Sequence, residues 1–230
     1  MTVLARLSSS ATEASHRTFV RRRRLRIVVA VAVVALASGV LLRKQVLRAA
    51  GQALVVSDPI GPADVIVVAS DAAGAGVLEA ADLVNSGIAT RVAVFADPPG
   101  PVDREFIRRG LPYEDEAARS TRQLVSLGVR SVEQIPRAVA GSEDESRVLP
   151  GWCDEHRFRS VVLVSKADHS RRLRRLLRRS MKGHATTVAI RPSRYSRFDP
   201  DRWWETRDGT RAQIIEFQKL VLDVLLHPFS

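Results

Sequence analysis

The fold is decided by the stretch Val161-Val-Leu-Val-Ser-Lys-Ala-Asp-His169-Ser-Arg-Arg172. A short apolar run rich in β-branched residues opens there into a polar loop that carries a histidine, and an arginine-dense helical pattern follows. In open α/β sheets, ligands bind beyond the carboxyl ends of the strands, where loops and helix N-termini present donors and charge. The stretch therefore predicts a strand–loop–helix unit and the position of a candidate site.

Similar units recur along the chain from residue 63 onward. The other strand-like runs are Val65–Ala69, Val92–Phe95, Val132–Ile135 and Thr187–Ile190. Helical patterns alternate with them at Gly76–Ser86, Tyr113–Leu127, Glu143–His156, Ser170–Met181 and Thr210–Leu226. This alternation predicts an α/β fold, a Rossmann-like three-layer sandwich with a mostly parallel sheet of about five strands. The apolar residues of the last helix are expected to pack onto that sheet.

The positive charge of the chain is concentrated at its amino terminus. The 230 residues carry a formal net charge of +11, but the first 50 hold ten Arg and Lys against Glu13 alone. Only +2 remains for the other 180 residues, so no nucleic-acid partner is predicted. The single cysteine, Cys153, excludes an internal disulfide, and no histidine spacing typical of a metal site is present.

The amino-terminal segment has the pattern of a membrane anchor. Ile27–Leu42 is an uncharged apolar run that basic residues bound on both sides, with most of the charge before it. The positive-inside rule then predicts a cytoplasmic amino terminus and a carboxy-terminal domain on the extracytoplasmic side of the cell membrane. A cleaved signal peptide is the alternative, because Ala35-Leu36-Ala37 fits a small-x-small cleavage pattern.

Four segments follow from these patterns. They are a basic cytoplasmic tail at 1–24, a transmembrane signal anchor at 25–45, a linker at 46–62 and the α/β domain at 63–230. The linker is predicted from its glycines and prolines.

Polar residues after the first predicted strand do not form a dinucleotide fingerprint. Gly74 and Gly76 begin a G-x-G-x-x-G pattern, but Glu79 occupies the position of the third glycine. No NAD or FAD site is predicted, and the cofactor is unknown. Asp71 remains a candidate ligand-binding group because it follows a strand end.

Two further pairs of candidate residues come from the later loops and the helices that follow them. Ser142 and Glu145 have the spacing of a helix capping box, and they lie near the carboxyl edge of the predicted sheet, so both a structural and a site role stay open. His169 has the side chain best suited to proton transfer near neutral pH. Arg172 lies in the first turn of the following helix and is suited to holding a phosphate or carboxylate. The arginines beyond it are expected to form a solvated helix face.

These motifs together resemble the YdcF/SanA/ElyC-like family, bacterial envelope proteins of largely unknown activity with a Rossmann-like domain. The resemblance spans about Ala63 to Leu225 and rests on four elements: the opening strand Ala63-Asp-Val-Ile-Val-Val68, the helix Glu116-Ala-Ala-Arg-Ser-Thr-Arg-Gln-Leu-Val-Ser-Leu-Gly-Val129, the pair Ser142-x-x-Glu145, and Val164-Ser165-x-x-x-His169-x-Arg-Arg172. It implies that Glu116, Ser142, Glu145, Ser165, His169 and Arg172 converge on one pocket. Two strand-end loops, around Ser70-Asp71 and Ala96-Asp97-Pro98-Pro99, and Lys166 depart from the family pattern.

The resemblance implies an envelope protein that binds or processes a small anionic ligand. In an enzyme, His169 would act as general acid or base, Glu116 or Glu145 would orient it, and Arg172 would hold the anion, with Asp71, Ser142 and Ser165 as further ligand-binding groups. A catalytically inactive scaffold that binds lipid or a partner is the alternative. Binding of an adenosyl compound such as S-adenosylmethionine is a third possibility.

Overall fold

The structure of this chain is a computed structural model that describes residues 28–29, 31, 38–40, 42–136 and 141–228. It divides into two units, residues 1–47 and 48–230, and the second holds the α/β domain. The predicted basic tail and most of the predicted anchor lie outside the described residues. Within the described part of the chain, no helix is long and apolar enough to cross a membrane.

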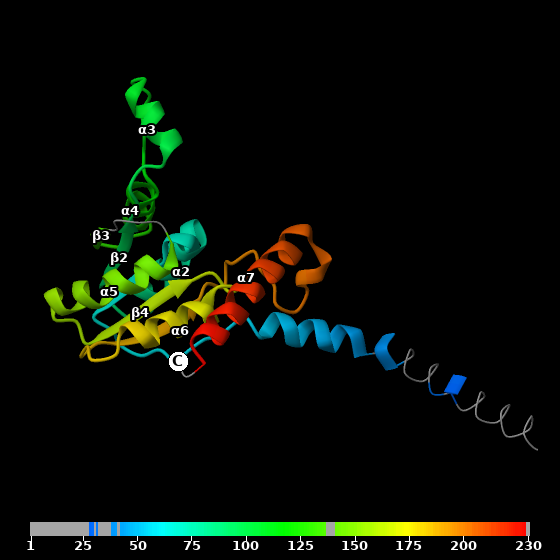
Figure 1. Cartoon of the computed structure of the whole chain (residues 1–230). Coiled ribbons are helices and arrows are strands. Elements are labelled where there is room, and N and C mark those ends of the chain that lie inside the picture. The colour runs from blue at the N-terminus through cyan, green and yellow to red at the C-terminus, as the bar shows by residue number, and fades with distance from the viewer. Residues whose placement is uncertain (1–27, 30, 32–37, 41, 137–140, 229–230) are drawn as a thin grey trace, which may run out of the picture. The chain divides into compact units, whose positions relative to one another are not determined.

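A five-stranded parallel sheet forms the centre of the domain (Figure 1). The strands are β1 (Val65–Val68), β2 (Arg91–Ala96), β3 (Ser131–Pro136), β4 (Ser160–Ser165) and β5 (Thr187–Pro192), and they lie in the order β3-β2-β1-β4-β5. All neighbouring pairs are parallel. This is the order of the first five strands of a Rossmann fold, so the predicted α/β class with a parallel sheet is confirmed.

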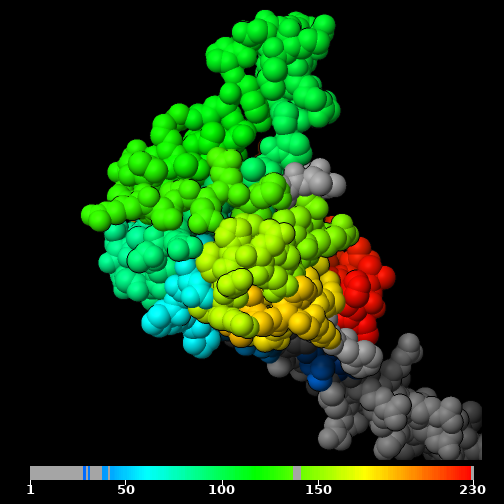
Figure 2. Space-filling view, turned by 90° about the vertical axis from the view of Figure 1, so that its left-hand side faces the viewer, coloured from blue at the N-terminus to red at the C-terminus, as the bar shows by residue number. Residues whose placement is uncertain are grey.

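Helices cover both faces of the sheet. On one face, α2 (Ala73–Asn85) and α4 (Glu116–Ser126) contact each other and the strands β1, β2 and β3. On the other, α5 (Ser142–His156) and α6 (Ser170–Ser180) lie side by side, as Figure 2 shows in yellow-green and yellow. Every residue of β1 is buried, which explains why that strand is uniformly apolar.

The last helix, α7 (Arg207–Leu226), differs from the expectation. It contacts α6 and the short helix η2 (Trp203–Glu205), and its buried residues are Gly209, Gln213, Glu216 and Leu220. Apart from Leu220, the apolar side chains that were expected to pack onto the sheet are exposed instead, including 50% of Ile214 and 73% of Leu225. Polar contacts from arginines of α6 hold the helix in place.

One helix was not predicted. α3 (Pro101–Arg108) follows β2 and has no buried residue. The backbone amide of Gly100 donates to the carboxylate of Asp103 at 3.0 Å, which caps the helix locally. α3 does not contribute to the core.

Residues 48–62 pack against the domain, although their composition predicts a linker. The chain is helical from 42 to 52, and a side chain on Gly51 would collide with the carbonyl oxygen of Pro200. Leu54 is 1% exposed. Asp58 then pairs with the edge strand β5: its amide donates to the carbonyl of Ile190 at 2.9 Å, and its carboxylate accepts from the amide of Ile190 at 3.0 Å. The compact unit therefore begins at Arg48.

Candidate functional site

The chain changes direction across the sheet between β1 and β4, which are neighbours. β1 is followed by β2 on one side, and β4 is followed by β5 on the other, so the carboxyl ends of β1 and β4 mark the topological switch point. Ligands of open α/β folds bind at such points. Asp71 follows β1, and Ser165 and His169 lie at the end of β4 and just beyond it. The sequence therefore places three predicted site residues at the expected edge.

His169 forms a buried pair with Glu216 of α7. Its Nδ1 lies 3.0 Å from Oε2 of Glu216, and the side chains are only 4% and 11% exposed. Nη2 of Arg172 lies 3.0 Å from the same Nδ1, and Nε of Arg172 donates to the same carboxylate oxygen at 3.1 Å. Lys219 donates to Oε1 of Glu216 at 2.7 Å. Three basic side chains thus converge on one carboxylate.

The charge of Glu216 sets the tautomer of His169. Burial alone would raise the pKa of Glu216, but the hydrogen bond and charge of His169, with Lys219 and Arg172, hold that pKa well below its usual range. The carboxylate is therefore ionised and can only accept, so Nδ1 of His169 carries a proton and donates it to Glu216. A carboxylate that fixes a histidine in this way is the arrangement that orients a catalytic base.

The other ring nitrogen of His169 has no hydrogen-bond partner among the described residues. This nitrogen, Nε2, is a polar atom, yet it is buried. An unpaired buried polar atom costs free energy, so such atoms are uncommon in folded proteins and often mark functional positions. Oδ1 of Asp71, at the end of β1, is buried without a described partner in the same way. Both predicted site residues thus have one buried polar atom without a described hydrogen-bond partner.

A basic cavity of about 630 Å³ lies between α5, α6 and α7. Ser142 and Arg172, both predicted to bind ligand, line it. Its other charged groups are Arg147, Arg179 and Lys219, against Glu143 and Asp223, and His227 also lines it. The excess of basic side chains fits an anionic ligand. Arg172 connects this cavity with the pair of His169 and Glu216.

Most arginines of α6 are ion-paired within the domain, which the expectation of a solvated helix face did not include. Arg175 and Arg179 donate to Asp223 of α7 at 2.6 and 2.5 Å, and Arg174 pairs with Asp58. Arg171 donates to the carbonyl of Val55 at 2.9 Å. Arg178, by contrast, is exposed. The arginine-dense pattern therefore serves mainly to attach α7 and the segment before β1.

The other predicted residues lie in separate contacts. Glu145 is 2% exposed and accepts from the amide of Ser70 at 2.8 Å. No side-chain cap closes the start of α5, where Gly141 is the N-cap, so the predicted capping box with Ser142 does not form. Glu116 pairs with Arg119 at 3.1 Å. The hydroxyl of Ser165 donates to the carbonyl of Lys166 at 3.1 Å.

These contacts divide the predicted residues into two groups. His169, Arg172 and Ser142 belong to the side of the site near α6 and α7. Glu145 and Glu116 both lie beside Ser70, the first through its hydrogen bond and the second across a small shared recess. The residue that contacts His169 is therefore Glu216 rather than either of the carboxylates proposed to orient it.

Sequence reasoning missed Glu216 because its signal is inverted. In the sequence, the apolar side chains of this helix predict which face is buried. A charged residue on another face is therefore predicted to be exposed. Its spacing from Gln213 and Leu220 puts all three on one face, but nothing in the sequence marks that face as the buried one.

A second cavity, of about 520 Å³, opens at the same edge of the sheet. Asp168, Lys166 and Arg197 line it, together with the start of α2 at Gly74. Burial raises the pKa of the Asp168 carboxyl, and the charges of Glu216 and Asp71 add to this effect. A carboxyl group with a raised pKa beside a cavity is a further candidate for proton transfer.

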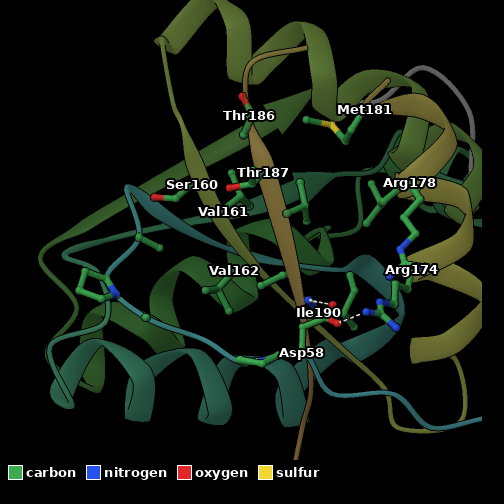
Figure 3. Close-up of a pocket in the computed structure, with 17 residues that line it drawn as sticks. Asp58, Ser160, Val161, Val162, Arg174, Arg178, Met181, Thr186, Thr187 and Ile190 are labelled. Carbon is green, nitrogen blue, oxygen red and sulfur yellow. Dashed lines mark hydrogen bonds and ion pairs between the residues drawn. The ribbon is translucent and has the colours of Figure 1, made fainter. Parts of the chain in front are cut away.

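A third cavity lies away from the predicted site. It has a volume of about 540 Å³ and covers the beginnings of β4 and β5, near Ser160 and Thr187, as Figure 3 shows. Asp58 crosses one end of it, between Arg174 and the amide of Ile190. None of the predicted site residues lines this cavity, and it faces the amino ends of the strands. Its lining comes from the segment before β1, from β4 and β5 and from α6, so the cavity lies where that segment packs against α6.

The comparisons with known proteins add no family to this description. No family model, no curated protein and no solved structure matches the chain. Within the described residues, no group of three or more His, Cys, Asp or Glu is placed to hold a metal ion. Functional conclusions therefore depend on the geometry of the site.

Proposed function

We propose that this chain is a membrane-anchored, YdcF-like envelope protein that binds and processes a small anionic ligand. The ligand lies in the basic cavity that Ser142, Arg147 and Arg172 line. His169 acts as general acid or base, and Glu216 is its positioning residue. The apolar run Ile27–Leu42 anchors the chain, and the domain lies on the extracytoplasmic side.

One observation carries the proposal: Arg172 lines the basic cavity and also contacts both His169 and Glu216. A ligand anion in the cavity is thus one side chain away from a histidine that an ionised carboxylate orients. In the neutral form of His169, with Nδ1 donating to Glu216, Nε2 carries the lone pair that accepts a proton from a bound hydroxyl or water. The site fits proton transfer at a phosphate-bearing ligand, for which lipid-linked and nucleotide-like molecules are the candidate classes.

Ligand binding is tested on the purified full chain by its melting midpoint. We expect inorganic pyrophosphate or uridine diphosphate to raise the midpoint, because a ligand that binds only the folded state stabilises it. Arg147→Gln, in the cavity, is expected to reduce the increase several-fold. Arg178→Gln is the matched control, since Arg178 is exposed on α6 and lies outside this cavity.

An increase with S-adenosylmethionine alone would instead favour the adenosyl-binding alternative. An equal reduction of the increase in Arg147→Gln and Arg178→Gln would show that binding depends on general surface charge, which contradicts the cavity. No increase with either phosphate probe would also count against the proposed ligand class.

The role of His169 separates an enzyme from a catalytically inactive scaffold. We expect His169→Gln to abolish complementation of an envelope-sensitivity phenotype in cells that lack the chain, because glutamine retains hydrogen bonding but cannot act as a base. Pyrophosphate binding should persist in the purified variant. Full complementation by His169→Gln would contradict a catalytic role and favour the scaffold.

A further inference from the structure

The helix α7 turns its polar face toward the domain and its apolar face outward. The face that packs inward carries Gln213, Glu216 and Asp223, which bind Ala50, His169 with Arg172, and the two arginines of α6. The outward side chains are largely apolar and exposed. The exposed apolar side chains are Ile214 (50%), Ile215 (38%), Phe217 (44%), Val221 (41%), Leu222 (57%), Val224 (41%), Leu225 (73%) and Leu226 (65%), of which Leu222 and Leu226 also line the basic cavity.

Helix geometry places most of these side chains on one surface. At 100° per residue, Ile214, Val221 and Leu225 lie within about 40° of the direction opposite Glu216, and Phe217 and Leu222 flank them. A continuous apolar surface of this kind marks an interaction site. Exposing such an apolar surface to water is unfavourable. The ion pairs on the inner side of α7 nevertheless hold the helix in this orientation.

The chain itself indicates what covers the surface. Gln213 of α7 donates to the carbonyl of Ala50 at 2.9 Å, so α7 is attached to the segment that leads from the amino terminus. Leu42, the end of the apolar run, lies eight positions before Ala50, and because the chain is helical between them, the two residues are about 12 Å apart along the helix axis. A bilayer that holds this run is therefore within reach of a helix about 30 Å long.

The charge around α7 is complementary to anionic lipid headgroups. Arg207 and Arg211 lie on the same outward side as the apolar residues, about two turns and one turn before Ile214, respectively. Trp203 and Trp204 precede the helix, and tryptophan is enriched at the membrane–water interface. An apolar helix face with arginines at its beginning is typical of a helix that lies in the plane of the interface.

We propose that the outward face of α7 lies in the headgroup region of the membrane that holds the chain's own amino-terminal segment. The inference rests on the proposed membrane localisation. It adds that the domain has a defined orientation on the membrane surface. With α7 against the lipid, the inner face of the same helix places Glu216 and His169 close to the membrane surface. The site is then positioned for a ligand that carries a lipid.

The test uses the full chain with Cys153 replaced by alanine and one new cysteine that carries an environment-sensitive fluorophore. Leu225→Cys and Val221→Cys probe α7, and Val125→Cys on α4, exposed by 57%, is the matched control on the other face of the sheet. Each protein is reconstituted into vesicles of phosphatidylglycerol and phosphatidylcholine with brominated acyl chains. We expect quenching at positions 221 and 225 to exceed that at 125 several-fold.

Three other outcomes would overturn the inference, and they are distinguishable. Equal, weak quenching at all three positions in vesicle-bound protein would leave the anchor intact and remove the role of α7. Cross-linking between two copies through Leu225→Cys, without quenching, would identify the surface as a contact between copies of this chain. Failure of the protein to remain with the vesicles would refute the membrane address, and the inference with it.

Discussion

Glu216→Ala is expected to lower the free energy of unfolding by about 3–5 kcal/mol, the usual effect of removing one partner from a buried ionic network. The carboxylate accepts from His169, Arg172 and Lys219, and the first two are 4% and 11% exposed at the side chain. Without it, a buried guanidinium loses its partner and α7 loses a principal attachment to α6. Chemical denaturation of the full chain measures the change.

The acid dependence of the free energy of unfolding, compared between wild type and Glu216→Gln, gives a second measurement. Burial alone would raise the pKa of Glu216, but His169, Lys219 and Arg172 hold it well below the ordinary 4.5. A depressed folded-state pKa means that the stabilisation is complete above about pH 4.5 and is lost as the pH falls toward the folded-state pKa. The difference between wild type and Glu216→Gln is therefore expected to be largest at neutral pH and to narrow below about pH 4.5.

Glu105→Ala is the control for both measurements. Glu105 also contacts two basic side chains, Arg108 and Arg109, but all three groups are exposed on α3. We expect little change at any pH, because exposed ion pairs contribute little. Equal losses for Glu105→Ala and Glu216→Ala, or a difference that stays constant into acid, would contradict the buried network.

The sequence predicted the sheet because its strands are buried on both faces. β1 and β4 are short, β-branched and bounded by polar loops, so their assignment as buried strands follows from the local pattern. α3 and the packing of residues 48–58 were not predictable in this way. α3 buries nothing, and the segment at 48–58 is fixed by contacts such as that of Asp58 with Ile190, which join residues far apart in the sequence.

The candidate site was predictable in position but not in its partners. His169 and Asp71 follow strand ends, so topology places them at the switch point. Glu216 comes from the last helix, 47 residues after the histidine, and its role depends on α7 turning its polar face inward. The arginines of α6 show the same limit, because a charge pattern does not reveal that Asp58 and Asp223 neutralise it.

Glu79→Ala is expected to lower the free energy of unfolding by about 2–3 kcal/mol, the range for hydrogen bonds to charged groups. Glu79 occupies the third-glycine position of the failed dinucleotide fingerprint, and its side chain is 1% exposed. Its carboxylate accepts from Nε of Arg191 at 2.8 Å and from the amide of Arg194 at 3.0 Å. The residue thus joins α2 to the end of β5, at the position where a dinucleotide-binding fold has a glycine that lets the helix pack closely on the strand.

The melting midpoint should fall by roughly 5–10 °C, since 1 kcal/mol corresponds to about 2–4 °C in a domain of this size. Asp82→Ala, one turn further along α2, is the matched control, because Asp82 also contacts Arg194 but from an exposed position. A small change in that variant, together with a large one in Glu79→Ala, would assign the effect to burial of the carboxylate. If Glu79→Ala leaves the midpoint unchanged, Arg191 and the Arg194 amide find other partners, and the joint between α2 and β5 does not depend on this charge.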